Sequence, residues 1–229
     1  MPKICFISDS HSKHKKVIVP ECDLLIHAGD WSFTGEHHET VNFAKWINKQ
    51  PAKEIVVIPG NHERIFFKHL PDTLEWFKEV NFRGHLLIDQ SINLYGLNIY
   101  GSPWTPAFGF DWAWNAGRTV VEASYMLQPF IGDIWAKIPD NTDILVTHGP
   151  PLGILDEVLN FGTGRIESVG CKELSKRIDQ LPNLKYHVFG HIHLNGGKLY
   201  QRVDGPVFIN ASVCDERYQP VNTPVVIEI

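Results

Sequence analysis

The sequence lacks the marks of a membrane or exported protein. No apolar run approaches the roughly 20 residues that a membrane-spanning helix needs. The apolar run at residues 4–7 is too short for the hydrophobic part of a signal peptide. The four cysteines have no Cys-x-x-Cys spacing, which favours buried thiols over disulfides or zinc ligands. We therefore expect a cytoplasmic protein that has no membrane partner and lies in a reducing compartment.

The chain also lacks an excess of basic residues, because its formal net charge is -5 at pH 7. Proteins that bind long nucleic acids neutralise phosphates with many Lys and Arg side chains, so we do not expect such a partner. A small nucleotide substrate remains compatible with this charge. The sequence shows no internal repeat, low-complexity tract or domain linker. With 229 residues, 43% of them hydrophobic, it predicts a single domain over residues 1–229 and indicates no oligomeric state.

Histidine, in contrast, is abundant, with 12 residues. The stretch Gly190-His191-Ile192-His193 follows an apolar run at residues 186–189 that predicts a buried strand. Side chains two residues apart in extended backbone point to one side, so both rings can reach one metal site. Taken alone, this stretch is explained equally well by a surface loop that happens to contain histidine.

Four other apolar runs end in the same way, in residues that commonly bind metals. The ligand-type residues at the five strand ends are Asp9 and His11, Asp30, Asn61 and His62, His148, and His191 and His193. Open α/β sheets place their chemistry at the carboxyl ends of strands. Five such ends, each beside a glycine or small residue, favour a metal centre over a core of hydrogen-bonded histidines. Mixed imidazole, carboxylate and amide donors suit Mn, Fe, Co or Zn.

The hydrophobic pattern alternates between strand-like and helix-like segments. The predicted strands cover residues 3–7, 24–26, 55–58, 85–89, 97–100, 143–146, 186–189, 198–203, 207–210 and 225–229. The predicted helices cover residues 36–49, 64–80, 120–138 and 171–180. Pro71 predicts a break in the second helix, with Asp72 or Thr73 as its cap, and Pro129 and Gly132 predict breaks in the third.

The remaining histidines have plainer interpretations. His27 and His187 lie inside strand runs, which favours packing in the core or support of the site over metal binding. Five others are predicted to lie on the surface: His14, His37, His38, His69 and His85. Glu63 is expected either to orient His62 or a ligand, or to form a salt bridge within its loop.

The stretch of residues 104–114 is unusually aromatic. It contains Trp104, Phe108, Phe110, Trp112 and Trp114. One interpretation is a stacking wall for a nucleobase, because every base has a π-face. The other, which we favour, is a loop that buries its own rings over the edge of a sheet. Asn115 and Arg118 follow this stretch, and an arginine there is able to steer a phosphate.

The ordered motifs resemble those of the calcineurin-like metallophosphoesterases. They are Asp9-Ser10-His11, Gly29-Asp30, Gly60-Asn61-His62-Glu63, His148-Gly149-Pro150-Pro151 and Gly190-His191-Ile192-His193. Glu63 stands where the family usually has aspartate. Three further segments look like the metallophosphoesterase-domain-containing subfamily: residues 101–104, 147–153 and 210–214. The resemblance implies a mixed α/β fold, a four-layer sandwich of two mixed β-sheets flanked by helices, with a dimetal site at the strand ends.

The resemblance also implies roles for individual residues. The first of two divalent ions would be bound by Asp9, His11, Asp30 and His193, and the second by Asp30, Asn61, His148 and His191, so that Asp30 bridges them. Manganese is favoured in vitro. His62 would act as the catalytic residue that assists the leaving group. Two divalent ions, two carboxylates and one hydroxide leave roughly one positive charge, which favours a phosphate ester.

These roles imply a dimetal-dependent phosphoester hydrolase. Its reaction would be in-line attack on phosphorus by a metal-bridging hydroxide. The subfamily points to small phosphodiesters, with cyclic nucleotides among the candidates. The alternative is a metal-binding or nucleotide-binding module with little turnover that acts as a sensor or scaffold.

Overall fold

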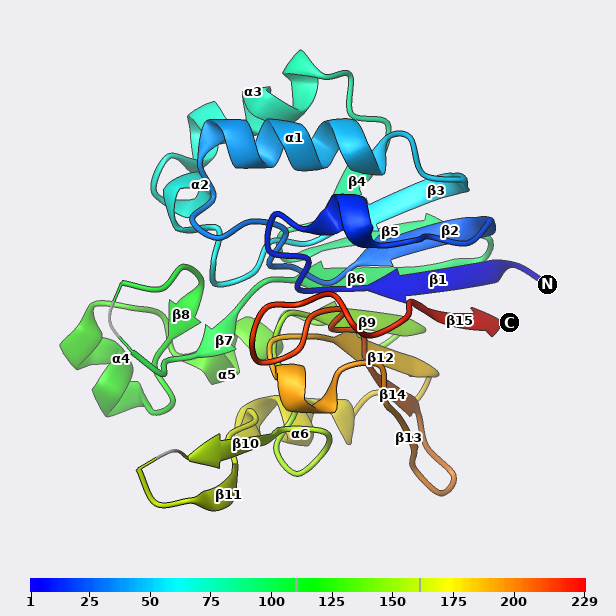
Figure 1. Ribbon diagram of the computed structural model, residues 1–229. Coiled ribbons are helices and arrows are strands. Elements are labelled where there is room, and N and C mark those ends of the chain that lie inside the picture. Colours follow the sequence, from blue (N-terminus) through cyan, green and yellow to red (C-terminus); the bar gives the residue numbers. More distant parts are fainter. Residues whose placement is uncertain (110, 161) are drawn as a thin grey trace.

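The computed structural model describes residues 1–109, 111–160 and 162–229 of the chain. Within these residues, two large mixed β-sheets pack face to face, and helices cover their outer faces (Figure 1). The first sheet has the strand order β15-β1-β2-β3-β4. Its strands are β1 Lys3–Ile7, β2 Cys22–His27, β3 Ala52–Val57, β4 His85–Leu86 and β15 Val225–Glu228. The predicted sandwich of two mixed sheets flanked by helices is confirmed.

The second sheet has the strand order β13-β14-β12-β9-β6-β5. Its strands are β5 Gln90–Leu94, β6 Leu97–Ser102, β9 Ile144–Thr147, β12 Tyr186–Phe189, β13 Leu199–Gln201 and β14 Val207–Asn210. Strand β5 was not predicted. It pairs antiparallel with β6 at the edge of the sheet, and its partly exposed, mostly polar residues give little hydrophobic signal.

Alternation along β1 shows how the strands bury both faces. Ile4 and Phe6 point between the two sheets, whereas Cys5 and Ile7 point under helix α1 (His37–Ile47), where Phe43 is buried. This two-residue period is the one that a strand imposes on its side chains. All four cysteines are buried free thiols, as predicted: Cys5, Cys22, Cys171 and Cys214.

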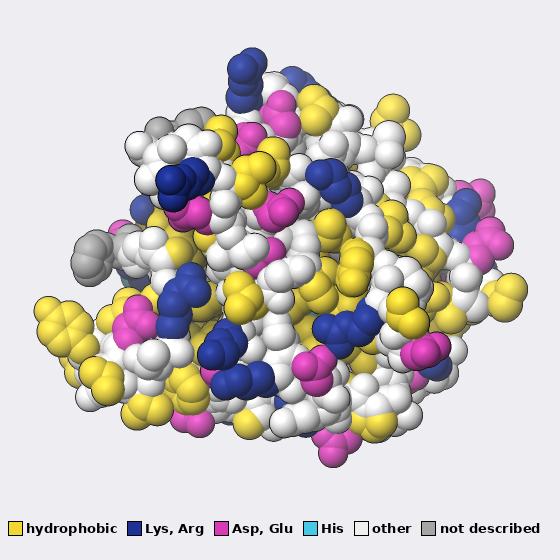
Figure 2. All heavy atoms as spheres, turned by 90° about the horizontal axis from the view of Figure 1, so that it is seen from below, with side chains coloured by type: hydrophobic (Ala, Val, Ile, Leu, Met, Phe, Trp, Pro, Cys, Tyr) yellow, Lys and Arg dark blue, Asp and Glu magenta, His cyan; other side chains and the backbone are white. Residues whose placement is uncertain are grey.

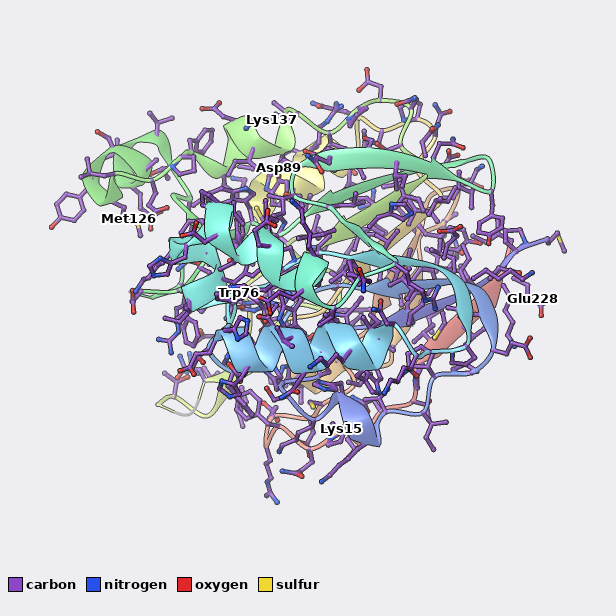
Figure 3. All side chains as sticks on the ribbon, turned by 90° about the horizontal axis from the view of Figure 1, so that it is seen from above. Lys15, Trp76, Asp89, Met126, Lys137 and Glu228 are labelled. Atoms are coloured by element: carbon purple, nitrogen blue, oxygen red, sulfur yellow. The ribbon has the colours of Figure 1, made fainter. Side chains whose placement is uncertain are left out.

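Helices α1 and α3 (Leu70–Glu79) lie side by side over the first sheet, as Figure 3 shows from above. The labelled Trp76 of α3 places its ring 5.1 Å from that of His37 on α1. Helix α2 (Arg64–Lys68) ends before His69, which caps α3. The predicted split of this segment into two helices is confirmed, but the break lies at His69 and not at Pro71, because proline is tolerated in the first turn of a helix. Asp72 and Thr73 lie inside α3 and do not cap it.

The other helices belong to the second half of the molecule. Helices α5 (Ile131–Trp135) and α6 (Lys172–Ile178) pack on the second sheet, and α4 (Val120–Met126) lies apart beside the short strands β7 (Thr105–Pro106) and β8 (Asn115–Ala116) (Figure 1). A hairpin that was not predicted, β10 (Glu157–Asn160) with β11 (Arg165–Ser168), projects from the same side. Single 3₁₀ turns cover His14–Lys16 and His193–Asn195. Among the described residues, no helix is both long enough and apolar enough to cross a membrane.

Parallel pairing sets the position of the candidate site. Strands β1, β2 and β3 pair in parallel, and so do β6, β9, β12 and β14. Their carboxyl ends meet at one edge of the sandwich, while the two chain termini lie together at the opposite edge (Figure 1). Every predicted ligand follows one of these strands, so the topology brings the polar residues to one place.

Candidate metal centre

The loops that leave β1 and β2 are joined by backbone hydrogen bonds. The N–H of Asp9 donates to Gly29 O at 2.9 Å, and the N–H of His11 donates to Asp30 O at 3.0 Å. Asp9, His11, Asp30 and His191 have positive φ values of 54°, 39°, 56° and 67°. Side chains rarely adopt this backbone conformation, and it persists at functional sites because the surrounding structure enforces it. Here it turns four of the seven predicted ligands toward a common centre.

All seven predicted metal ligands lie in one cluster. Two triads have ligand atoms that lie within 4.8 Å of one another: Asp9, His11 and His193, and Asp30, His148 and His191. The seventh predicted ligand, Asn61, joins the second triad, because its Oδ1 lies 2.9 Å from His148 Nε2. The two triads correspond to the two ligand sets that the sequence motifs imply.

Asp30 lies between the two triads. Its Oδ2 is 3.9 Å from His11 Nε2 in one triad and 3.2 Å from His148 Nε2 in the other. Its Oδ1 accepts the N–H of His62 at 2.8 Å, which fixes the plane of the carboxylate. This is the position expected of a carboxylate shared by two ions.

Backbone carbonyls fix the orientation of three imidazole rings. The Nδ1 atoms of His11, His148 and His193 donate to Ser32 O at 3.3 Å, to Ala28 O at 2.9 Å and to Asp215 O at 2.8 Å. A carbonyl only accepts, so each Nδ1 carries a proton and each Nε2 is the nitrogen left to face the cluster. The Nε2 atoms of His11 and His193 face each other at 3.2 Å, an arrangement that suits a cation between them.

The charges of the cluster fit divalent cations as well. Burial by itself raises the pKa of Asp9, yet the imidazoles of His193, His148 and His11 hold the pKa of this carboxyl well below its usual range. Burial likewise opposes ionisation of Asp30, but His148 and His62 lower its pKa. Burial lowers the pKa of His191 to about 3, so its ring is neutral. Burial by itself lowers the pKa of His148, but the Asp30 carboxylate raises it to about 9, so this ring would release a proton when a metal binds.

Glycines beside the ligands let their side chains pass close to the backbone. A Cβ on Gly190 would collide with Asp9 Oδ2 and Ser8 Oγ, and one on Gly60 would collide with the Asp30 carboxylate. The Gly-His and Gly-Asn pairs of the motifs therefore have a steric cause: the Asp9 and Asp30 carboxylates occupy the space that a side chain would need.

The sequence matches the model of the calcineurin-like phosphoesterase family over residues 2–195. The chain belongs to the calcineurin-like phosphoesterase family. It is therefore a phosphoester hydrolase of a family that uses dinuclear metal sites, and the ligand triads are its candidate metal centre.

Similar proteins cover nearly the whole chain. Metallophosphoesterase domain-containing protein 1 of Homo sapiens is 35% identical over 97% of this chain and 69% of its own length. A UPF0046 protein of Caenorhabditis elegans is 31% identical over 97% of this chain and 79% of its own length. The solved structure of TT1561 of Thermus thermophilus aligns with a TM-score of 0.55 at 11% identity, covering 91% of this chain and 88% of that one, which shows a likeness of fold alone.

Two further groups support the phosphoesterase centre: Ser212, which was not predicted, and Glu63, for which two interpretations were open. The hydroxyl of Ser212 donates to Asp9 Oδ2 at 2.7 Å. The buried carboxylate of Glu63 accepts the N–H groups of Asp30 at 3.0 Å, Ser32 at 3.0 Å and Gly60 at 2.7 Å, and so joins two ligand loops. Of the two interpretations of Glu63, support of a ligand loop is therefore correct. Ser212 follows the end of β14, and this strand end was the signal that could have found it.

His62 lies at the same centre and opens onto a cleft. Its Nδ1 donates to Phe33 O at 2.9 Å, and one of its ring nitrogens lies within 4.8 Å of ligand atoms of His11 and Asp30. The cleft has a volume of about 350 Å³ and is lined by predicted ligands together with Phe108, Trp112, Val158, Leu159, Leu194, Glu216 and Tyr218. Tyr218 packs edge-on against His11, with ring centroids 4.7 Å apart.

The aromatic stretch at residues 104–114 fits both interpretations in part: some rings are buried over the sheet edge, and others line the cleft. Trp114 is buried and packs on Phe67 of α2, with ring centroids 4.6 Å apart, as expected of a loop that covers the sheet edge. Phe108 and Trp112, in contrast, line the cleft. Phe110 lies outside the described residues.

The other single-residue predictions have mixed outcomes. His27 and His187 are buried and bonded to Ser10 Oγ at 3.2 Å and Thr147 Oγ1 at 2.8 Å, which confirms core positions. His37, His38 and His69 are exposed and His85 is half-buried. The surface prediction for His14 is wrong, because a 3₁₀ turn directs its ring against Trp46 and only 2% of the residue is exposed. Arg118 Nε donates to Ala107 O, and Arg118 is not part of the ligand cluster.

Proposed function

We propose that this phosphoesterase is a dinuclear-metal phosphodiesterase that hydrolyses small phosphodiesters, including cyclic nucleotides. The observation that carries the proposal is the composition of the cleft. Predicted ligands form its floor and aromatic rings form its walls, and the described residues that line it include no lysine or arginine. Such a cleft suits a singly charged phosphate with an organic group on each side.

The seven ligands are assigned to two ions. Asp9, His11 and His193 would hold the first and Asn61, His148 and His191 the second, with Asp30 shared. When bound, the metals lower the pKa of a water molecule to provide the nucleophile, and they neutralise charge on the phosphoryl oxygens. Hydrolysis adds this water across the P–O bond, so the leaving oxygen must gain a proton.

His62 is the residue that we assign to the leaving group. Its Nδ1 proton is committed to Phe33 O, so the opposite ring nitrogen is the one available to donate to the leaving oxygen. Its ring lies 4.8 Å from Trp112 and 4.6 Å from His11, between the cleft wall and the ligands. General acid catalysis of this kind is typically worth about 10² to 10⁴ in rate.

The preference for diesters follows from charge. A phosphomonoester carries close to two negative charges at neutral pH, and a diester carries one. Apart from the metals, the cleft offers no fixed cation from Lys or Arg among the described lining residues, and it contains Glu216. The second charge of a monoester would therefore be poorly compensated.

The preference for nucleotides follows from the aromatic side chains that line the cleft. Phe108 and Trp112 stack on each other with ring centroids 5.8 Å apart, and Tyr218 lines the same cleft. Stacking on aromatic side chains is worth about 1–3 kcal/mol per base. A long polyanion is disfavoured by the net charge of -5. On the face shown in Figure 2, basic side chains are interspersed with acidic and hydrophobic ones and form no continuous groove.

The test is a substrate panel. Protein loaded with Mn²⁺ would be assayed on bis-p-nitrophenyl phosphate, p-nitrophenyl phosphate, and 2′,3′- and 3′,5′-cyclic nucleotides. We expect turnover of the diesters in preference to the monoester, with at least one cyclic nucleotide among the substrates. If the protein holds metal but turns over no diester, the proposal fails and the low-turnover binding module replaces it.

We place the reaction in the cytoplasm because all four thiols are unpaired.

A further inference from the structure

A second cavity adjoins the cleft at Trp112. It has a volume of about 440 Å³, and Trp112 is the residue that it shares with the cleft. Helix α2 contributes Arg64 and Lys68 to its lining, and α4 contributes Tyr125 and Met126. Figure 3 labels Met126 on α4, which lies beside the end of the molecule that carries α2.

The cavity carries the positive charge that the cleft lacks. Arg64 and Lys68 are four residues apart on α2 and so share one face of the helix. Asp111 faces both, with Oδ1 2.8 Å from Lys68 Nζ and Oδ2 3.8 Å from an Arg64 terminal nitrogen. Two cations and one carboxylate leave a net positive charge, on a chain whose overall charge is negative.

Arg64 has capacity for a further partner. Its side chain lines the cavity and remains 34% exposed. Its single close carboxylate contact among the described residues, to Asp111, is long at 3.8 Å. A guanidinium that is not saturated by protein groups is suited to bind the oxygens of a phosphate or carboxylate.

Trp112 connects this cavity to the chemistry. The Arg64 guanidinium carbon lies 5.4 Å from the centre of the Trp112 ring, and the same ring lies 4.8 Å from His62. A molecule that places its phosphoester at the ligands can therefore extend along Trp112 toward Arg64. Tyr125, which is 89% exposed, adds a second ring at the cavity mouth.

We propose that this cavity is a second subsite, which binds the part of the substrate that remains on the phosphate after cleavage when that part carries its own negative charge. The inference rests on the proposed phosphodiesterase function and narrows its substrate class. The preferred diester joins its leaving group to an organic residue that bears a phosphate or carboxylate about one nucleoside away.

Binding is measured with thymidine 3′,5′-bisphosphate and thymidine 5′-monophosphate, titrated by calorimetry into the Mn²⁺-loaded protein. The Kd of the monophosphate divided by the Kd of the bisphosphate measures how much the 3′-phosphate contributes to binding. We expect R64Q and K68Q each to weaken bisphosphate binding about tenfold and to reduce this ratio. D111N removes the competing carboxylate and should strengthen bisphosphate binding a few-fold. K176Q is the control, because Lys176 is similarly exposed and pairs with Glu173 on α6.

K68Q should weaken bisphosphate binding and D111N should strengthen it. A general loss of folding would weaken binding in both variants, so it cannot produce this result. A ratio that is the same in wild type, K68Q and D111N would overturn the subsite. A second measurement compares KM for thymidine 5′-(p-nitrophenyl phosphate) with and without a 3′-phosphate, and K68Q should raise KM more for the phosphorylated diester. If wild type releases no p-nitrophenol from either compound, the proposed function fails, while the calorimetric ratio still decides whether the subsite exists.

Discussion

The hydroxyl of Ser212 donates to Asp9 Oδ2 at 2.7 Å and so ties the last part of the chain to the first strand end. The N–H of His191 reaches the same carboxylate, 3.1 Å from Oδ1 and 3.0 Å from Oδ2. These donors set the rotation of the Asp9 carboxylate beside His11 and His193. Ser212 lies beyond residues 2–195, the part of the chain that matches the family model, so this support comes from outside the matched region.

Replacing Ser212 with alanine should weaken the first metal site. Loss of the hydroxyl leaves Asp9 Oδ2 short of a donor and free to rotate, and groups that orient metal ligands are worth about 10- to 100-fold in affinity. Manganese titration followed by calorimetry should show one of two sites weakened and the other nearly unchanged. S91A, on the exposed face of β5, is the control. Equal weakening of both sites would argue against the assignment of Asp9 to one ion.

His62→Ala should lower kcat by about 10² to 10⁴ while metal content stays near that of wild type. The reason is that we assign to His62 the proton for the leaving group and do not count it among the seven predicted ligands. Metal content by mass spectrometry and kcat on bis-p-nitrophenyl phosphate would be measured on the same samples. Because His62 lies within 4.8 Å of His11 and Asp30 ligand atoms, a variant that loses metal would show that His62 is itself a ligand.

Glu39 should make an acid-sensitive contribution to stability. Its carboxylate accepts the N–H of Phe33 at 2.9 Å and the hydroxyls of Ser12 and Thr34 at 2.8 and 2.7 Å. Burial by itself raises the pKa of Glu39, but these donors lower it from 4.5 to about 2. The native state therefore favours the ionised form, so the stabilisation is complete above about pH 4.5 and is lost as the pH falls toward 2.

The corresponding test is urea unfolding of E39Q. The variant should be less stable than wild type by about 1 kcal/mol at pH 7, and the difference should shrink between pH 4.5 and 3. E75Q, whose carboxylate is exposed and pairs with Lys78, controls for general charge effects. A difference that grows on acidification would contradict the account of Glu39.

His14→Leu should stabilise the protein, more so in acid. Neither ring nitrogen of His14 has a hydrogen-bond partner among the described residues, and a buried polar group without a partner costs about 1–3 kcal/mol. Burial, and then Lys15, lowers the pKa of His14 to about 4, so the unfolded state binds the proton first below pH 6.5. The gain in Tm over wild type should therefore widen from pH 8 to pH 5. H69L, at an exposed position, should show no such widening; a gain for H14L that narrows in acid would refute the explanation.

The metal centre could be predicted from the sequence because its signals are local. Each ligand stands beside the carboxyl end of an apolar run, and parallel pairing then brings these ends together, as with Asp9, Asp30 and His148. The helices and central strands are similarly visible in hydrophobic periodicity. The edge strand β5 and the β10–β11 hairpin are not, because their residues are largely exposed and alternate weakly.

What the sequence could not provide depends on contacts between distant segments. Ser212 reaches Asp9 only because Ser212 forms a β-bridge with Ser8, the residue before Asp9. His14 looks exposed beside Lys15 and Lys16, yet a 3₁₀ turn and the rings of Phe43 and Trp46 bury it. The second cavity likewise is lined by residues of both α2 and α4, and no local sequence pattern marks it.

The most direct test of the central claim compares wild type with Asp30→Asn, both supplied with Mn²⁺, on bis-p-nitrophenyl phosphate. Asp30 Oδ2 lies between His11 and His148, so the amide should cost metal occupancy and most of the activity. The account predicts that wild type binds two metal ions and hydrolyses the diester, whereas D30N holds fewer ions and retains less than about 1% of kcat/KM. Equal metal content and equal turnover in the two proteins would contradict it.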